Sequence, residues 1–204
     1  MSNTIDFYFD FSSPYAYLGS TRIEALAQKH NRTINWHPIL LGAIFKVSGQ
    51  APLTSYPLKG DYALHDFNRA AREHNIPYQF PDPFPIGAVA ASRACCWLKA
   101  SDNASENDKL TPFVHAIFKA YYVDGRNISE LDEVLAVAQA VGIDKESLAL
   151  GVGEQSVKDA LKTAVDQAIK IGVFGAPTTL VDGELFWGND RIEQMDRWLS
   201  RGGW

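Results

Sequence analysis

The pattern of hydrophobic and polar positions in the first forty residues predicts a strand, a helix and a second strand. Residues 5–11 alternate large apolar side chains with other types and are rich in strand formers. A serine followed by proline, Ser13-Pro14, is typical of a helix start, and apolar residues at helical spacing extend that helix over residues 14–30. Residues 33–40 predict another strand, so the chain is expected to open with two parallel strands and a right-handed crossover.

The middle of the chain has a different pattern. Residues 41–85 are rich in proline, glycine and aromatic side chains, which predicts loops with one short helix at residues 60–74. Helical spacing then returns and predicts four longer helices, which are separated by polar turns such as residues 103–108. These helices span residues 87–100, 109–122, 129–141 and 156–171.

The last thirty residues return to a strand pattern. Residues 173–181 and 184–187 are separated by Asp182-Gly183, which is a strong hairpin signal, and residues 191–200 form a final predicted helix. This order predicts an α/β protein with a thioredoxin-like domain and a helical insertion domain, although other α/β folds remain open at this point. The expected ranges are 1–42 plus 168–204 for the thioredoxin-like domain and 43–167 for the insertion.

Composition narrows the function more than the fold. The chain has 204 residues, 46% hydrophobic and 21% charged, which is ordinary for a globular protein. A net charge of −5 lacks the basic footprint of nucleic-acid binding, so we expect no nucleic-acid partner. No apolar run approaches the roughly 18–20 residues of a membrane span. The N-terminus carries no secretion signal, which predicts a cytoplasmic protein.

Cysteine and histidine provide little candidate chemistry. The two cysteines, Cys95 and Cys96, are adjacent and are expected to pack on a helix as small apolar side chains. The five histidines have no metal-ligand spacing, so we expect no metal site. A serine hydrolase is disfavoured because the chain has no Gly-x-Ser-x-Gly motif.

The first candidate site is Ser13, between the first strand and the first helix. Free backbone N–H groups and the helix dipole stabilise an anion at such a junction by ~0.3–1 kcal/mol. Redox proteins of this fold have a Cys-x-x-Cys motif there, whereas this chain has serines, which excludes disulfide exchange by that route. Ser13 can donate a hydrogen bond to a thiolate from another molecule, or it can simply cap the helix.

Two further candidate sites lie near the C-terminus. Pro177 removes one ladder donor, and a cis Ala176-Pro177 bond would turn the Ala176 backbone toward an extended, peptide-like ligand. The alternative is a proline in an edge strand. Asp190 stands at a helix start with Glu193 at capping spacing, so its carboxylate suits the ammonium group of an amino-acid ligand. The alternative there is an ordinary N-cap.

Three motifs, residues 9–18, 173–178 and 186–191, together resemble the 2-hydroxychromene-2-carboxylate isomerase family. That family is related to kappa-class glutathione transferases and to disulfide oxidoreductases with a helical insertion. The resemblance covers nearly the whole chain and keeps the order of the motifs. It implies a glutathione-dependent isomerase that acts on a small aromatic acid and, by analogy, forms a homodimer.

The resemblance also implies roles for individual residues. Ser13 takes the position of the active serine, and Ser12 is the lesser candidate. Lys46 is expected to meet the carboxylate of the substrate, with Ser55 and Lys59 on the same side. The residues expected to bind glutathione are Ser13, Ala176, Pro177, Trp187, Gly188, Asn189 and Asp190.

The substrate side departs from the family pattern at two positions. The family often has asparagine where this chain has Ser55 and Gly87, so the identity of the substrate stays open. Aromatic residues in the insertion suit a flat apolar substrate, although many of them are expected to pack in the core. These aromatic residues are Tyr56, Tyr62, Phe67, Tyr78, Phe80 and Phe84.

The implied reaction converts 2-hydroxychromene-2-carboxylate, or a related aromatic hemiketal acid, to trans-o-hydroxybenzylidenepyruvate in aromatic hydrocarbon catabolism. A free thiol has a pKa near ~8.5, and the Ser13 hydroxyl with the helix N-terminus would favour its thiolate. We hypothesise that the thiolate adds to the substrate, permits ring opening and bond rotation, and leaves unchanged. The alternatives are a kappa-like glutathione transferase or peroxidase, and a non-catalytic thioredoxin-fold binding module.

Overall fold

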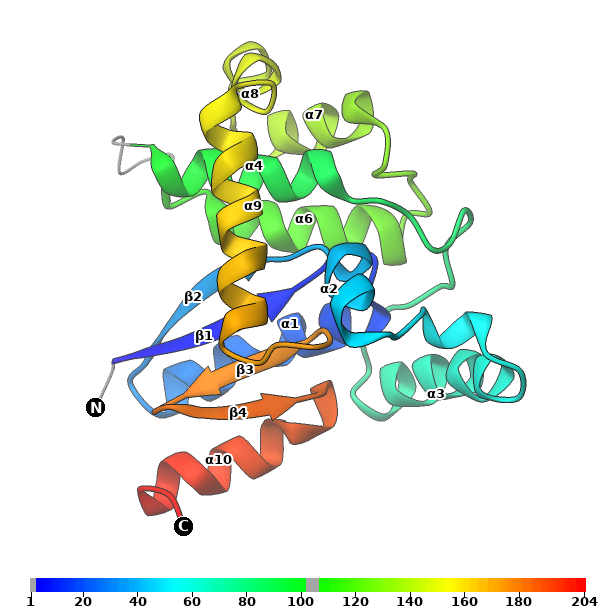
Figure 1. The fold of residues 1–204 in the computed structure, drawn as a ribbon, viewed down its shortest axis with the longest axis vertical. Helices are drawn as coiled ribbons and strands as arrows, with labels where there is room; N and C mark the ends of the chain where they lie inside the picture. Colours follow the sequence, from blue (N-terminus) through cyan, green and yellow to red (C-terminus); the bar gives the residue numbers. More distant parts are fainter. Residues whose placement is uncertain (1–2, 102–106) are drawn as a thin grey trace.

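A four-stranded mixed sheet forms the centre of the protein (Figure 1). The computed structural model describes residues 3–101 and 107–204. The strand order is β2-β1-β3-β4, with β1 parallel to β2 and antiparallel to β3, and with β3 antiparallel to β4. The strands are Thr4–Phe9 (β1), Thr33–Pro38 (β2), Thr178–Val181 (β3) and Glu184–Trp187 (β4). The sheet therefore unites the N-terminal unit with the C-terminal hairpin, and the predicted α/β, thioredoxin-like class is confirmed.

Helices cover both faces of the sheet and extend beyond it. In the view of Figure 1, α1 lies behind the sheet, α9 crosses in front of it, and α4, α6, α7 and α8 gather above it. The first helices are Pro14–Lys29 (α1), Leu41–Ser48 (α2), Lys59–Glu73 (α3), Val89–Ala100 (α4) and Leu110–Tyr122 (α6). The later ones are Leu131–Ala140 (α7), Lys145–Gly151 (α8), Gln155–Lys170 (α9) and Ile192–Arg201 (α10). Two 3-10 turns, η1 and η2, span Leu53–Ser55 and Asn189–Arg191.

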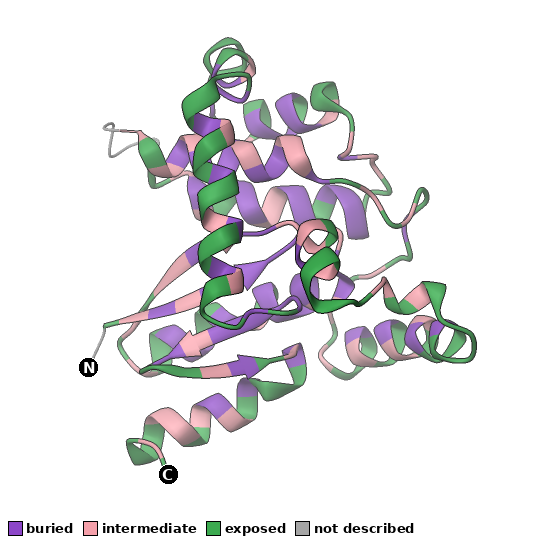
Figure 2. Ribbon diagram, viewed as in Figure 1, coloured by how far each residue is buried: buried purple, intermediate pink, exposed green. Residues whose placement is uncertain are grey.

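One aromatic core joins the sheet to the helices above it. Phe9 and Phe11 pack against Phe118 of α6, with ring centroids 5.8 and 4.9 Å away. Trp36 of β2 packs edge-on against Phe9 at 5.7 Å. Figure 2 shows the buried residues running from β1 into α6. The helical insertion thus shares a core with the sheet, and the predicted domain ranges stay a prediction.

The prediction of a loop directly after residue 40 is wrong, because α2 occupies that segment. The N-cap residue of α2, Leu40, forms no side-chain hydrogen bond to the helix. Instead, the backbone N–H of Leu41 donates to a carboxylate oxygen of Asp10 at 2.7 Å. A residue 31 positions earlier therefore stabilises the start of this helix, which local sequence patterns do not show. The short helix α8 was not predicted either, although Asp144 caps it through the backbone N–H of Ser147.

The predicted strand at residues 173–181 is shorter in the structure. The strand begins at Thr178, and the Ala176-Pro177 bond before it is cis, as considered from the sequence. The carbonyl of Pro177 accepts a hydrogen bond from Gly188, so this segment turns toward the residues after β4. The predicted polar turn at residues 103–108 lies mostly outside the described residues. None of the helices within the described ranges is long and apolar enough to cross a membrane.

Candidate active site

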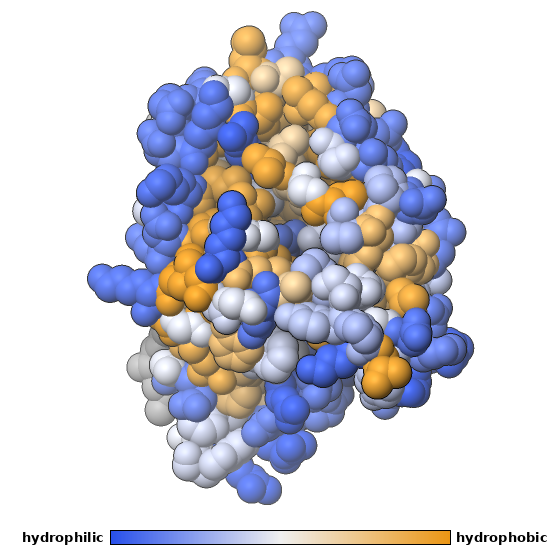
Figure 3. All heavy atoms as spheres, turned by 45° about the vertical axis from the view of Figure 1, so that its right-hand side comes forward, coloured by the Kyte–Doolittle hydropathy of each residue, from blue (hydrophilic) through white to orange (hydrophobic). Residues whose placement is uncertain are grey.

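A cavity of about 1480 Å³ opens beside the N-terminus of α1, between the sheet and the helices α2 and α3. Figure 3 shows the hollow on the face where these helices come forward, edged by both hydrophobic and hydrophilic side chains. The predicted site residues that line it are Ser13, Lys46, Lys59, Ala176, Trp187, Gly188, Asn189 and Asp190. The fold therefore brings all three motifs to one place.

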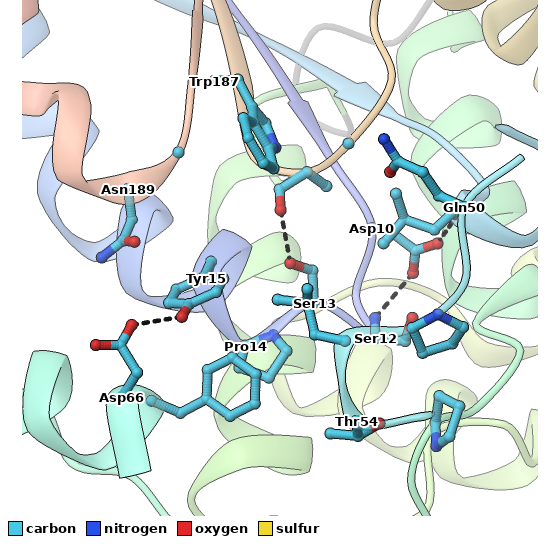
Figure 4. A pocket seen from close by; sticks show the side chains of 18 of the residues that line it. Asp10, Ser12, Ser13, Pro14, Tyr15, Gln50, Thr54, Asp66, Trp187 and Asn189 are labelled. Atoms are coloured by element: carbon cyan, nitrogen blue, oxygen red, sulfur yellow. Dashed lines mark hydrogen bonds between the residues drawn. The ribbon is translucent and has the colours of Figure 1, made fainter. Parts of the chain in front are cut away.

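Ser13 connects the first motif to the second. Its side-chain oxygen Oγ accepts a hydrogen bond from the backbone N–H of Ala16 at 3.2 Å, so Ser13 does cap α1. The same hydroxyl donates to the carbonyl of Ala176 at 2.9 Å (Figure 4). Ser13 is buried, and yet it lines the cavity. A residue that caps the helix is thus also placed to meet a ligand, so the two interpretations of Ser13 are compatible.

Asp10 lies beneath this junction and was not predicted as a site residue. Its carboxylate accepts hydrogen bonds from the backbone N–H groups of Ser12 at 2.8 Å and Leu41 at 2.7 Å. Burial raises the pKa of Asp10, and the two backbone donors partly offset that rise. The only signal in the sequence was an acidic residue within the aromatic run of residues 7–11. Asp10 holds the start of α1 and the start of α2 together at the edge of the cavity.

The third motif forms the upper wall in Figure 4. Trp187 is half exposed and packs against Phe174 with ring centroids 4.8 Å apart. A Cβ atom at Gly175 would lie 2.5 Å from the indole Nε1 of Trp187, so only glycine allows this close packing. Gly188 has a φ of 115°, a region that favours glycine. The two glycines therefore let the indole and the following turn approach the cavity.

Asn189 and Asp190 follow in the turn η2. Asn189 is buried, and its carbonyl accepts a hydrogen bond from Arg22 of α1. Asp190 is exposed and forms an ion pair with Arg191 at 3.2 Å. The backbone of this turn is thus anchored to α1, while the Asp190 carboxylate remains accessible to a ligand.

The predicted substrate side is more exposed. Lys46 on α2 and Lys59 at the start of α3 both line the cavity, and Lys59 lies 5.7 Å from the ring centroid of Tyr56. Ser55 is not among the lining residues, and its hydroxyl donates to the carbonyl of Pro52 at 2.6 Å. The neighbouring Thr54 lines the cavity instead. Among the predicted site residues, Ser55 and Pro177 are thus the two that do not line the cavity.

Four of the six predicted aromatic residues line the cavity, one packs inward, and Phe80 is exposed outside the cavity. Tyr56, Tyr62, Phe67 and Phe84 line the cavity. Tyr78 stacks on the buried Tyr122 instead, with ring centroids 5.9 Å apart. The sequence pattern alone could not separate the lining residues from the other two, because the residue types are the same.

A Tyr15–Asp66 pair was not predicted and links α1 to α3. The Tyr15 hydroxyl donates to the Asp66 carboxylate at 2.5 Å, and Asp66 also pairs with Arg69 (Figure 4). Burial, together with the hydrogen bond to Asp66, raises the pKa of Tyr15. Tyr15 stands inside the first motif, but nothing in the sequence identified its partner. This pair holds α3 over the cavity next to Ser13.

The cysteines are remote from this chemistry. Cys95 and Cys96 are buried on α4, and burial raises the pKa of both thiols, to about 11 for Cys96. A raised pKa keeps a thiol protonated and unreactive. No three His, Cys, Asp or Glu side chains in the described parts of the chain gather in a way that could hold a metal ion.

Comparison with known proteins shows the family to which this chain belongs. The model of the DsbA-like thioredoxin domain family matches residues 4–200. The chain belongs to this family. The 2-hydroxychromene-2-carboxylate isomerase of Sphingobium xenophagum is 31% identical to it, over 98% of this chain and 99% of that protein. Human glutathione S-transferase kappa 1 is 26% identical, over 98% of this chain and 94% of that protein. These relatives confirm the resemblance indicated by the three motifs and support an enzyme of the isomerase and glutathione-transferase type.

Solved structures show that other proteins share the fold of this DsbA-like chain. A structure of 2-hydroxychromene-2-carboxylate isomerase has a TM-score of 0.84 and 26% identity, and the match covers 97% of this chain and 95% of that chain. The cytosolic disulfide reductase DsbM from Pseudomonas aeruginosa, in a structure with GSH, has a TM-score of 0.67 and 16% identity over 97% of this chain and 96% of that chain. The second match shows the shared fold alone.

Proposed function

We propose that this protein is a glutathione-dependent isomerase of 2-hydroxychromene-2-carboxylate, or of a related aromatic hemiketal acid, in aromatic-compound catabolism. The observation that carries the proposal is the Ser13 hydroxyl, which caps α1 and donates to the Ala176 carbonyl inside the cavity. Ser13 thus connects the N-terminus of α1, which suits a thiolate, to the backbone of Ala176, which suits a peptide-like ligand. The homodimer and the cytoplasmic location stay predictions.

The residues along this side of the cavity suit glutathione in their chemistry. Ala176, just before Pro177, offers its backbone to the cysteinyl residue. The exposed Asp190 carboxylate suits the ammonium group of the γ-glutamyl residue, and the half-exposed Trp187 provides an apolar surface beside it. Glutathione, when bound, would supply a thiol whose anion is a reversible nucleophile. The acidic, hydroxyl and backbone groups present therefore fit this tripeptide.

Ser13 has one proton to donate, and the structure shows where that proton is directed without a ligand. The hydroxyl donates to Ala176 and accepts from Ala16, so its donor is in use. A ligand N–H that bonds to the Ala176 carbonyl would release the Ser13 proton to turn toward a sulfur anion. The bond from Ala16 can persist, because it uses a lone pair of Oγ. Lowering the thiol pKa by ~2 units corresponds to about 2.7 kcal/mol of anion stabilisation.

The opposite side of the cavity suits an aromatic acid. Lys46 carries a positive charge on α2 that can meet the substrate carboxylate. Phe84 supplies apolar surface for a flat ring, whereas Phe67 is almost fully buried. The substrate would thus lie between a cationic, aromatic wall and the start of α1.

Calorimetry and a turnover assay test the proposal together. We expect glutathione to bind in a 1:1 ratio, and we expect isomerisation of 2-hydroxychromene-2-carboxylate to require glutathione while its total amount stays constant. S-methylglutathione is the matched control, because it should bind but should not support turnover. A chain that binds no glutathione would be a non-catalytic module of this fold, and the proposal would be wrong.

A second candidate is a kappa-like glutathione transferase, and the match to human glutathione S-transferase kappa 1 favours it. The two functions share every proposed glutathione contact and differ in the fate of the thiol. Net loss of glutathione with a model electrophile, without isomerisation of the aromatic acid, would favour the transferase.

A further inference from the structure

We propose that Arg93 forms a second ligand site, for a small carboxylate with an apolar body, separate from the large cavity. Arg93 lies on α4 and lines a cavity of about 310 Å³. The proposed function does not use this cavity, so the inference stands or fails independently of it. The two cavities share Gly87 and Val89 in their walls, so they are neighbours at the start of α4.

The guanidinium of Arg93 lacks the partners that comparable arginines have. Its Nε atom is buried and has no hydrogen-bond partner, and no Asp or Glu among the described residues forms an ion pair with it. By contrast, Arg22 pairs with Glu193 and Arg126 pairs with Glu133. A guanidinium without an anionic partner in the protein can bind an anion from solution, and a carboxylate is the anion that matches its planar shape best.

The other residues that line this small cavity indicate that the ligand has an apolar body. Most of them are apolar, Ser129 adds one hydroxyl, and no acidic side chain is among the described residues that line it. A volume of about 310 Å³ is at the lower end for ligand sites, which are typically ~300–1,000 Å³. The apolar lining consists of Val89, Ala90, Leu131, Ala149 and Val152. The cavity thus fits one ring or one short chain that carries a single carboxylate.

Two sources could supply such a ligand. One is an aromatic acid, such as a compound that also enters the neighbouring large cavity, and the other is a short aliphatic acid from elsewhere in metabolism. The shared chemistry is an anionic carboxylate on an apolar body. Titration with trans-cinnamate and with hexanoate separates the two sources.

The test is a titration of the full-length protein followed by backbone amide NMR. We expect trans-cinnamate to shift the amide signals of Ala149 and Gly153, which lie at the small cavity. Cinnamyl alcohol, which has the same body without the charge, should bind at least ten-fold more weakly. Arg93→Gln should abolish these shifts, Arg93→Lys should retain part of them, and the control Arg197→Gln on α10 should retain them fully.

Several outcomes would overturn the site. Shifts confined to Ser13 and Ala176 would mean that the acid binds only in the large cavity. Equal binding of cinnamate and cinnamyl alcohol in the wild-type protein would exclude recognition of the charge, and this comparison needs no variant. Unchanged shifts in Arg93→Gln would show that Arg93 is not the recognition residue. Glutathione titration, read at Ser13 and Ala176, tests the proposed function separately.

Discussion

The two walls of the large cavity are built differently. The sheet wall, defined as Ser13, Ala176, Gly188 and Asn189, is largely buried and is held by hydrogen bonds between distant segments. The helical wall, defined as Lys46, Tyr56, Lys59 and Tyr62, is exposed, and Tyr62 has 61% of its surface accessible. Buried contacts restrict substitution, whereas exposed side chains can change without disturbing the core. The comparison suggests that the sheet wall suits a ligand that stays constant and the helical wall suits one that varies.

Replacing Ser13 should have the largest effect. Ser13→Ala removes the donor proposed for the thiolate, and loss of one such preorganised donor lowers kcat by ~100-fold or more. It also removes an N-cap, which costs ~1 kcal/mol of the free energy of unfolding. Steady-state turnover and urea unfolding measure the two effects.

A control variant separates the capping role of Ser13 from its proposed catalytic role. Asp144→Ala removes the cap of α8, which accepts from the backbone N–H of Ser147 at 2.8 Å. It should lower the free energy of unfolding, because a helix cap is lost, and leave turnover unchanged. Near-normal turnover in Ser13→Ala would contradict the assignment of the sheet wall to the thiol.

Replacing Lys46 should have a smaller effect that falls on one ligand only. Lys46→Gln removes a positive charge from the helical wall, so KM for the aromatic acid should rise by about ten-fold, or ~1.4 kcal/mol. The Kd for glutathione should stay constant, because that ligand is assigned to the sheet wall. Lys170→Gln, at the exposed C-terminal end of α9, is the charge-matched control. A parallel loss of glutathione affinity would mean that the two walls do not bind separate ligands.

Replacing Asp6 or Asp10 should have the smallest effects. The contributions of these two aspartates to the free energy of unfolding should depend on pH in opposite directions. The hydrogen bond from His37 lowers the pKa of Asp6, whereas burial raises the pKa of Asp10. The contribution of Asp6 to stability is therefore present above its unfolded pKa of about 3.9 and is lost as the pH falls through its lowered folded pKa. The contribution of Asp10 is present below about 3.9 and is lost as the pH rises through its raised folded pKa.

Each variant serves as the control for the other, because the chemical change is the same. The measurement is urea unfolding at several pH values. For Asp6→Asn and for Asp10→Asn, the free energy of unfolding of the variant is subtracted from that of the wild-type protein. The first difference should shrink in acid and the second should grow. If both differences changed with pH in the same direction, the opposite pKa shifts of Asp6 and Asp10 would be contradicted.

The sequence by itself determined the elements whose causes are local. Ser13-Pro14 predicted the start of α1, because a serine cap and an N-terminal proline act within one helical turn. Asp182-Gly183 predicted the β3–β4 hairpin, and both residues have the positive φ that such a turn requires. Together with the order of the three motifs, these signals were sufficient for the fold class, and most of the predicted site residues line one cavity.

Only the tertiary structure decided the contacts between distant segments. The hydrogen bond from Ser13 to Ala176 joins residues 163 positions apart, and Leu41 begins α2 on the carboxylate of Asp10. The exclusion of Ser55 from the cavity and the unpaired state of Arg93 within the described residues also depend on how helices pack. Caps and turns are fixed by a few neighbouring residues, whereas such contacts form only when the whole chain has folded.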